Sequence, residues 1–118
     1  MHEENYEIAA DQLAVIKKSV SENKNIIAVG TTSVRVLESS HEFWPEAVSI
    51  KGSTDIFIYP GYKFKVVDHL LTNFHAPEST LLALVYAFGG EELIRRAYQE
   101  AIDRKYRFLS YGDAMFII

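Results

Sequence analysis

Several residue types and patterns are scarce in this chain, and their scarcity excludes whole classes of function. There is no cysteine, which rules out disulfide bonds, thiolate metal sites and cysteine nucleophiles. The longest apolar run, residues 81–88, is far shorter than the roughly 20 residues of a membrane-spanning helix. No secretory signal sequence is recognisable either, so we expect a cytoplasmic protein that does not associate with a membrane.

Positive charge is also in short supply. The 12 lysine and arginine residues face 16 aspartate and glutamate residues, which gives a formal net charge of -4. Proteins that bind nucleic acid strongly on their own usually present a basic face. The acidic balance therefore argues against strong, autonomous binding to nucleic acid.

The residues that are present are typical of one folded domain. A length of 118 residues with 48% apolar content suits a modest core. The pattern indicates an α/β fold in which helices pack on a mixed β-sheet. We expect a surface loop over 40–53, and neighbouring strands or a hairpin over 54–59 and 62–74 around Pro60-Gly61. The other expected elements are helices over 11–23, 33–39, 81–88 and 91–105 and strands over 26–29 and 114–118.

Residues 66–90 carry the strongest signal in the chain. An apolar strand leads into a polar cluster and then into a helix over 81–88. This helix is apolar on nearly every side, so it has to be buried. Pro77 suits the first helical position, where a missing N–H does no harm. Gly89-Gly90 supplies a left-handed stop at the other end.

The polar residues around the start of that helix are the first candidates for chemistry. A helix N-terminus leaves backbone N–H groups unpaired and carries partial positive charge. Such residues either cap the helix or hold a ligand, and both interpretations stay open. His75 is the best acid–base candidate, because imidazole titrates near neutral pH; the alternative is that it only hydrogen-bonds a loop. The residues concerned are Thr72, Asn73, His75, Glu78, Ser79 and Thr80.

A second candidate is the turn that follows the strand over 26–29. Gly30 permits a tight bend and the close approach of a ligand to the backbone. Thr31, Thr32 and Ser33 then place hydroxyl groups at a helix N-terminus. A simple N-cap is the alternative explanation. The turn lacks the repeated glycines of a dinucleotide loop and the Gly-Lys of a P-loop, so neither is predicted.

The remaining polar candidates are ambiguous. Asp113, after Gly112, can orient a base, bind a hydroxyl or form an Asx-turn. Arg107 can bind a carboxylate or phosphate, or form a structural salt bridge. Arg95 and Arg96 have carboxylates one helical turn away, so a solvated helix face explains them better than a nucleic-acid patch. No metal site is predicted, because no metal-binding spacing relates the four histidines, His2, His41, His69 and His75.

Three segments together resemble one protein family. Residues 28–39 (AVGTTSVRVLES), residues 56–90 with the motif TNFHAPEST, and residues 106–117 (YRFLSYGDAMFI) carry the resemblance. They are similar to the C-terminal portion of the S-adenosylmethionine:tRNA ribosyltransferase-isomerases of queuosine biosynthesis. The similarity covers nearly the whole chain, and the pairing of the last two motifs is specific. It is weakest over 40–53, and Asn5 stands where an aromatic residue is expected.

This resemblance implies an activity. Enzymes of the family transfer the ribosyl part of S-adenosylmethionine, their substrate, to 7-aminomethyl-7-deazaguanine in tRNA, and rearrangement gives epoxyqueuosine with release of adenine and methionine. A sulfonium acidifies the neighbouring ribose C–H, so a base such as His75 can start the reaction. The resemblance adds Tyr111 and Asp113 to His75 as candidate catalytic residues. The candidate substrate-binding residues are Gly30, Thr31, Thr32, Ser33, Thr72, Asn73, Phe74, Ser79, Thr80 and Arg107.

Length is the main departure from the family, whose members are much longer than 118 residues. We therefore expect residues 1–118 to form one domain, a C-terminal fragment of the family's catalytic domain. Such a fragment is expected to be inactive without the missing N-terminal portion, which carries much of the tRNA contact. The alternative is a non-catalytic remnant, or a module that needs that portion as a partner.

Overall fold

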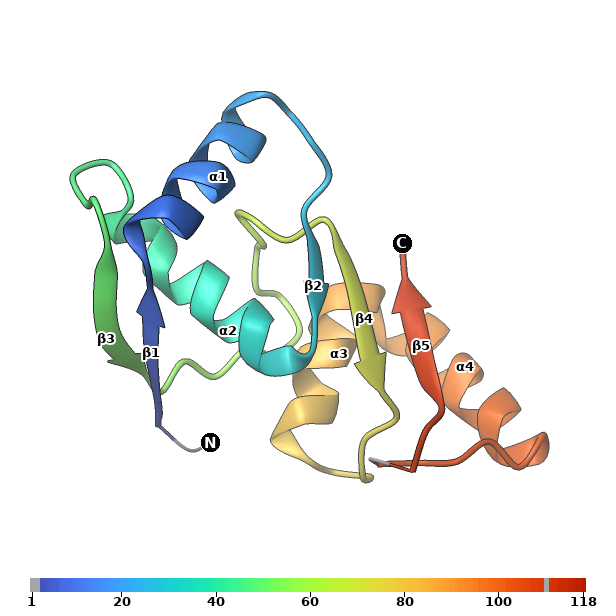
Figure 1. Ribbon diagram of the computed structural model, residues 1–118. Coiled ribbons are helices and arrows are strands. Elements are labelled where there is room, and N and C mark those ends of the chain that lie inside the picture. The colour runs from blue at the N-terminus through green and yellow to red at the C-terminus, as the bar shows by residue number, and fades with distance from the viewer. Residues whose placement is uncertain (1–2, 110) are drawn as a thin grey trace.

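Two small β-sheets and four α-helices make up the computed structural model, which describes residues 3–109 and 111–118 (Figure 1). A three-stranded mixed sheet has the order β2-β4-β5, with β2 parallel and β5 antiparallel to β4. Strands β1 and β3 pair antiparallel in a separate sheet. The expected α/β fold with a mixed sheet is confirmed. The elements are β1 (Glu4–Ile8), α1 (Ala10–Ser21), β2 (Ile27–Val29), α2 (Thr31–Ser40), the 3-10 helix η1 (His41–Phe43), β3 (Ile50–Thr54), β4 (His69–Asn73), α3 (Thr80–Gly89), α4 (Glu91–Asp103) and β5 (Ala114–Ile117).

The middle of the chain differs from the prediction. Residues 55–68, all of which the structure describes, form neither helix nor strand, so the strand predicted over 54–59 is wrong. Strand β3 lies instead in the segment expected to be a loop, and it pairs with β1. Strand β4 is shorter than the predicted 62–74 and pairs with β2 and β5, so the predicted hairpin is also wrong.

The physical reason is a buried carboxylate on α2. Glu38 is only 3% exposed, and its two oxygens accept four hydrogen bonds from the irregular segment. The backbone N–H groups of Lys65, Val66 and Val67 donate at 2.8, 2.9 and 3.0 Å, and the Tyr62 hydroxyl donates at 3.0 Å. These amides have a side-chain acceptor in place of a strand partner, which satisfies them without a β-ladder. Burial and the neighbouring Glu38 charge raise the pKa of Tyr62 to about 12.

A buried arginine one turn earlier on α2 holds the start of the same segment. Arg35 is 2% exposed, and its guanidinium donates to the carbonyls of Ile56 at 3.2 Å and Thr54 at 3.5 Å. It also pairs with the Glu4 carboxylate of β1 at 3.3 Å. Helix α2 therefore fastens β1, the end of β3 and the irregular segment through two charged side chains. The Arg35 charge is paired with Glu4, and the Glu38 charge is stabilised by its four hydrogen-bond donors, as burial of a charge requires.

Helix α3 begins within one residue of the predicted 81–88, but Pro77 is not its first helical position. Pro77 and Glu78 lie in a turn, and the first helical residue is Thr80. Ser79 caps the helix, its Oγ accepting from the Leu82 N–H at 3.1 Å. A serine oxygen satisfies a free N–H, and proline has no such acceptor, so the later start is favoured. Gly90, with φ of 87°, ends α3 and begins α4, as the glycine pair predicted.

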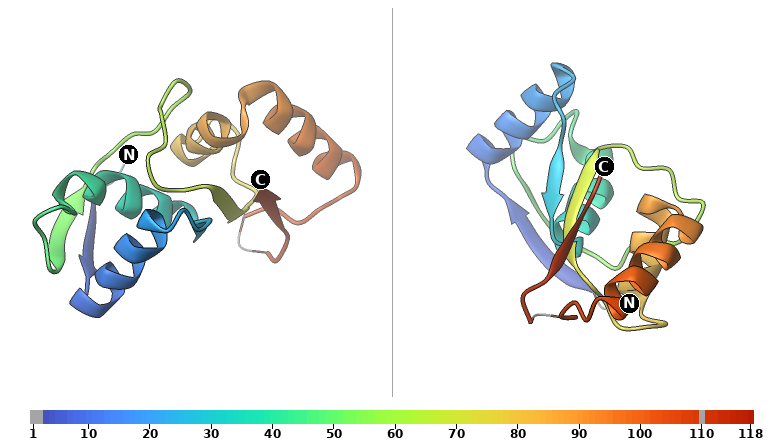
Figure 2. Two further views of the ribbon diagram at one scale, coloured as in Figure 1. Left: turned by 90° about the horizontal axis from the view of Figure 1, so that it is seen from above. Right: turned by 90° about the vertical axis from the view of Figure 1, so that its right-hand side faces the viewer.

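Helices α3 and α4 lie on one face of the three-stranded sheet (Figure 2). Leu82, Leu84 and Val85 of α3 are buried there, while the other apolar side chains of this helix are only partly covered. The prediction that the helix is wholly buried is therefore correct for one side only. Arg95 pairs with Glu91 one helical turn away on the exposed surface, as expected for a solvated helix face, and Arg104 after α4 pairs with Glu100 in the same way.

We expect Glu38→Gln to lower the free energy of unfolding by roughly 2–4 kcal/mol, because an amide NH₂ would face backbone donors and the charge that strengthens the remaining bonds would be lost. Urea denaturation followed by circular dichroism measures this change. Glu46→Gln, at an exposed carboxylate of the following loop, is the matched control and should change stability by less than about 0.5 kcal/mol. Equal effects of the two substitutions would contradict the assignment.

Candidate active site

The predicted site residues gather at one edge of the three-stranded sheet. Because β2 and β4 run parallel, both end at this edge, and α2 starts there directly after β2. The turn after β4, the start of α3 and the loop between α4 and β5 lie toward the same edge, at the bottom of Figure 1. Ligands of α/β proteins bind outside the carboxyl ends of parallel strands. The edge is therefore the place to look for a functional site.

His75 follows β4 at this edge and is half-buried. Its Nε2 lies 2.9 Å from Thr72 Oγ1, and its backbone N–H donates to the Tyr98 hydroxyl at 2.8 Å. Burial lowers the pKa of the imidazole below its ordinary value of 6.5. At neutral pH the ring is therefore uncharged. When Nε2–H donates to Thr72, the Nδ1 lone pair is available to take up a proton.

An aromatic cluster under His75 holds this position. Phe74 is 3% exposed and packs against the rings of Tyr98 and Phe108, with centroids 5.2 and 5.0 Å apart. Its carbonyl accepts from the Leu109 N–H at 2.8 Å, which draws the loop after α4 toward the end of β4. The Phe74 side chain, a predicted substrate-binding group, lies in the core in this structure. Its packing in the core fixes the backbone directly before His75.

Asp113 and Arg107 are partners in the loop between α4 and β5. The Asp113 carboxylate accepts from the Arg107 backbone N–H and from its Nε, the latter at 3.3 Å, and these hydrogen bonds hold the pKa of Asp113 below its usual range. The Asp113 carbonyl accepts from Asn73 Nδ2 at 3.3 Å, which ties the loop to the end of β4. Gly112 has a φ of 122°, and a Cβ there would lie 3.3 Å from the Arg107 guanidinium. Tyr111 projects outward and is 72% exposed.

The two helix N-termini at this edge differ in their capping. Helix α3 is capped by Ser79, so the capping interpretation is confirmed for that residue. Helix α2 begins after Gly30, whose φ is 91° and whose N–H donates to the Leu71 carbonyl at 2.8 Å. Among the residues that the structure describes, no side chain caps α2. Its N-terminus is the better candidate for an anion or a ligand hydroxyl.

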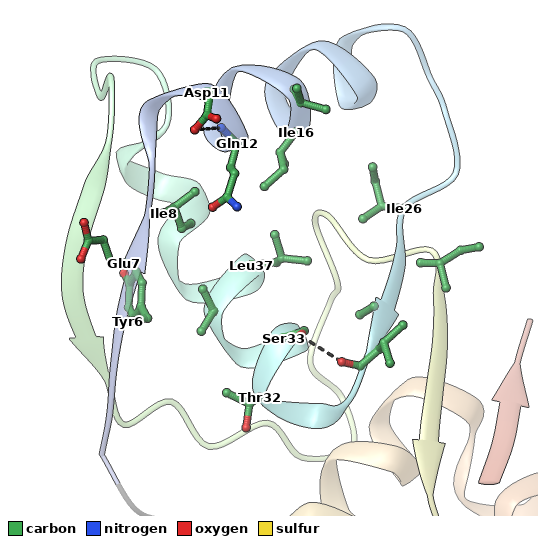
Figure 3. Close-up of a pocket in the computed structure, with 15 residues that line it drawn as sticks. Tyr6, Glu7, Ile8, Asp11, Gln12, Ile16, Ile26, Thr32, Ser33 and Leu37 are labelled. Carbon is green, nitrogen blue, oxygen red and sulfur yellow. Dashed lines mark hydrogen bonds between the residues drawn. The ribbon is translucent and has the colours of Figure 1, made fainter.

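The hydroxyl residues of α2 are not equivalent. Thr31 is 8% exposed, and Ser33 donates to the carbonyl of Val29 at 3.0 Å within its own turn. Thr32 is exposed and lines a cavity of about 900 Å³ between β1, α1, α2 and β2 (Figure 3). This cavity is mainly apolar, with Thr32 and Ser33 at one end. Of the three predicted hydroxyl residues, Thr31 is therefore buried, Ser33 is bonded to the backbone of Val29, and Thr32 is exposed to the cavity.

The other predicted residues divide between a second cavity and the loops. Ser79 and Thr80 line a separate hollow of about 500 Å³ together with Tyr86 and Arg95 of the outer helix surfaces. Neither cavity is lined by His75. The structure thus bonds Thr72 to His75 and ties the neighbouring Asn73 and Phe74 to Asp113 and Leu109, while the starts of α2 and α3 line separate cavities.

Metal and membrane features can be stated for the described residues. No group of three or more His, Asp or Glu side chains in residues 3–109 and 111–118 is arranged to hold a metal ion. His2, one of the histidines considered above, lies outside these residues, as do Met1 and Ser110. None of the described helices is long and apolar enough to cross a bilayer.

Sequence reasoning missed the role of Tyr98. It was one of the apolar positions of the predicted helix, and the structure shows its hydroxyl bonded to the His75 backbone. An apolar spacing along one helix gives no sign of such a bond, because the partner His75 follows β4 and is 23 residues away in sequence. The buried pair Arg35 and Glu38 was missed for the same reason.

Fold and site together define a class. An α/β unit with a half-buried neutral histidine, polar loops and an uncapped helix N-terminus at the carboxyl ends of parallel strands has the layout of a catalytic or ligand-binding α/β domain.

Comparison with known proteins gives the family. The family model described as "Queuosine biosynthesis protein" matches residues 1–117. Proteins called S-adenosylmethionine:tRNA ribosyltransferase-isomerase are 52% identical to the chain in Halothermothrix orenii and 53% in a Sulfurihydrogenibium species. A crystal structure of S-adenosylmethionine tRNA ribosyltransferase from Thermotoga maritima matches 97% of the chain with a TM-score of 0.91 and 46% identity. The chain belongs to the queuosine biosynthesis protein family.

The match is complete for this chain and partial for its relatives. All 118 residues align with the Halothermothrix protein but make up 35% of its length. The superposition on the Thermotoga structure covers 40% of that chain. The chain therefore spans about a third of the length of the curated relatives it matches.

We expect the His75 imidazole to titrate below pH 6.5, because burial disfavours its charged form. Proton NMR of the ring resonances measures the midpoint directly. The unfolded chain, with a histidine pKa of about 6.5, takes up the proton first. The free energy of unfolding should therefore fall as the pH drops from 6.5 toward the folded pKa, and His75→Asn should remove this contribution. A midpoint at or above 6.5 would refute the prediction.

Proposed function

We propose that this chain is part of an S-adenosylmethionine:tRNA ribosyltransferase-isomerase. The reaction is transfer of the ribosyl moiety of S-adenosylmethionine to 7-aminomethyl-7-deazaguanine in tRNA and its isomerisation to epoxyqueuosine. Family membership and the names of relatives that are about half identical over the whole chain support the proposal. S-adenosylmethionine is the ribosyl donor, and the scheme assigns no step to a metal.

The observation that carries the proposal is the environment of His75. Its burial keeps the imidazole neutral, and its Thr72 contact orients the ring at the carboxyl edge of β4. In the proposed first step the ring removes a proton from the ribose carbon next to the sulfonium. The electron pair stays on that carbon beside the positive sulfur, and the proton resides on the imidazole. A neutral base at pH 7 is what this step requires.

The other residues have supporting roles in this scheme. Asn73 donates to the Asp113 carbonyl at the same edge, and we assign it, the Arg107–Asp113 pair and the exposed Tyr111 to substrate contact. The uncapped α2 terminus at Gly30 to Ser33 offers backbone N–H groups to ribose hydroxyls or to the methionine carboxylate. Ser79 already caps α3, so its hydroxyl contributes to binding only by sharing that bond.

Catalysis in this proposal needs polypeptide beyond these residues. The net charge of -4 is poorly suited to holding tRNA, and the chain aligns with 35% of the Halothermothrix relative. We propose that the remaining two-thirds supplies the tRNA contact and completes the site. The competing possibility is a non-catalytic module that keeps the fold alone.

The isolated chain should release no adenine from S-adenosylmethionine in the presence of tRNA bearing the 7-aminomethyl-7-deazaguanine base. Addition of the remaining polypeptide of the Halothermothrix relative in trans should restore release, measured by chromatography of the products. Omission of the tRNA is the control, and it should abolish the signal. Inertness of the mixture, with both pieces folded, would favour the non-catalytic module.

His75→Ala in the reconstituted enzyme should lower the single-turnover rate by roughly 10²–10⁴-fold, the usual contribution of a general base. His41→Ala is the matched control, because His41 lies in η1 and packs on Trp44, and it should leave the rate unchanged. Rapid-quench measurement of adenine at saturating S-adenosylmethionine separates this chemical effect from binding. An unchanged rate for His75→Ala would remove His75 from the chemistry.

A further inference from the structure

One face of the three-stranded sheet carries no packed helix or strand over β4 and β5, among residues 3–109 and 111–118 (Figure 2). The register places Ile27 opposite His69, Val29 opposite Leu71, and Leu71 opposite Phe116. Side chains that are neighbours in this register point to the same side. Four apolar side chains and one imidazole, whose ring centroid lies 5.8 Å from that of Phe116, therefore form one surface. We call it the open face: Ile27, Val29, His69, Leu71 and Phe116.

Exposure distinguishes the two sides of this sheet. The alternate residues Ala28, Leu70 and Ile117 are buried on the side where α3 and α4 lie. On the open face Ile27 is 53%, Val29 66% and Phe116 51% exposed. Figure 2 shows both helices on the opposite side of the strands. An antiparallel sheet often has one polar face in water, but this face is mainly apolar, and one of its two strand pairs is parallel.

The open face continues into the cavity that Thr32 lines. Ile27 and Val29 also line the hollow of about 900 Å³ between β1, α1, α2 and β2. On its far side Ile16 of α1 and Leu37 of α2 add further apolar surface (Figure 3). The sheet face and this hollow form one continuous apolar area. Contiguous areas of this kind mark interaction sites.

The overall dimensions agree with an uncovered side. The chain exposes 7642 Å², whereas a folded monomer of 13.4 kDa is expected to expose about 6,500 Å². Its radius of gyration is 15.0 Å, against about 13.5 Å expected for a compact domain of this length. The excess of about 1,100 Å² is at least the share of one partner in a stable interface, which is about 800 Å².

We propose that the open face and its hollow are the docking surface for the polypeptide that corresponds to the remaining two-thirds of the relatives. This inference rests on the proposed function in one respect, namely that catalysis needs this additional polypeptide. The Thermotoga structure supports it, because the same unit, at a TM-score of 0.91, makes up only 40% of that chain. A unit embedded in a larger protein shows apolar surface where its neighbour is absent.

The location of the open face gives the docking a consequence for the site. Val29 directly precedes Gly30 and the uncapped start of α2, and Leu71 directly precedes Thr72, the His75 partner. A polypeptide seated on the open face therefore borders the carboxyl edge of β2 and β4. It would form the far wall of a cleft whose near wall is the His75 loop. This explains why His75 lines neither cavity in the isolated chain.

The test is physical association, measured without reference to activity. The chain is mixed with a separately produced polypeptide that comprises the part of the Halothermothrix relative outside the aligned region, and complex formation is followed by analytical ultracentrifugation. A one-to-one complex is expected. Val29→Lys and Phe116→Lys should each weaken it at least tenfold, because each puts a charge into the apolar contact. Val48→Lys, at a 77% exposed valine in the loop before β3, is the matched control and should have no effect.

Folding of each variant is checked by circular dichroism and thermal melting. If Val29→Lys unfolds at a lower temperature than the unsubstituted chain, Val29→Thr, which keeps the shape and β propensity of valine but adds a hydroxyl to the contact, replaces it and should also weaken the complex. Three results would overturn the proposal. They are no complex with the unsubstituted chain, equal weakening by Val48→Lys, or a homodimer through the open face that the added polypeptide does not displace. A complex that forms but releases no adenine would refute the proposed function and leave the docking surface in place.

Discussion

The hydrogen bonds of the Glu38 carboxylate are the interaction on which the rest of this structure depends. A carboxylate at 3% exposure is stable only because three backbone amides and a tyrosine hydroxyl donate to it. Those donors belong to residues 62–67, which precede β4. By holding them against α2, Glu38 sets where β4 enters the sheet, between β2 and β5. The register of β4 then decides which residues stand at the carboxyl edge.

That edge combines groups of opposite character. His75 is kept uncharged by burial, while the loop beside it carries the charged pair Arg107 and Asp113. The base required by the proposed chemistry and the polar groups required for substrate contact therefore occupy neighbouring positions on separate loops. The aromatic cluster around Phe74 holds the loop after α4 against the end of β4. The open face of the same sheet ends at this edge, so docking and catalysis share a boundary in the proposed enzyme.

Local patterns were sufficient for the helices and for strands β2 and β5, whereas β1 and β3 were not predicted. The apolar spacing of α4, the run of β-formers in β2 and the glycine stop at Gly90 each depend on residues close in sequence, and each was predicted. The segment 54–68 was not, because its β propensity is overridden by acceptors on α2 that lie more than 20 residues away. Pro77 was wrongly assigned to the first helical position of α3 because Ser79 competes with it as the boundary, and the Ser79 cap decides.

Motifs and periodicity, which are properties of neighbouring residues, were enough to indicate the family, the α/β class and the polar candidates. Which of those candidates meet depends on the three-dimensional packing. It turned Phe74 inward, gave Asp113 to Arg107, left the α2 terminus uncapped and exposed one face of the sheet. Such outcomes depend on which distant backbone groups approach each side chain, and strand register and buried charge pairs set that approach. No local pattern encodes them.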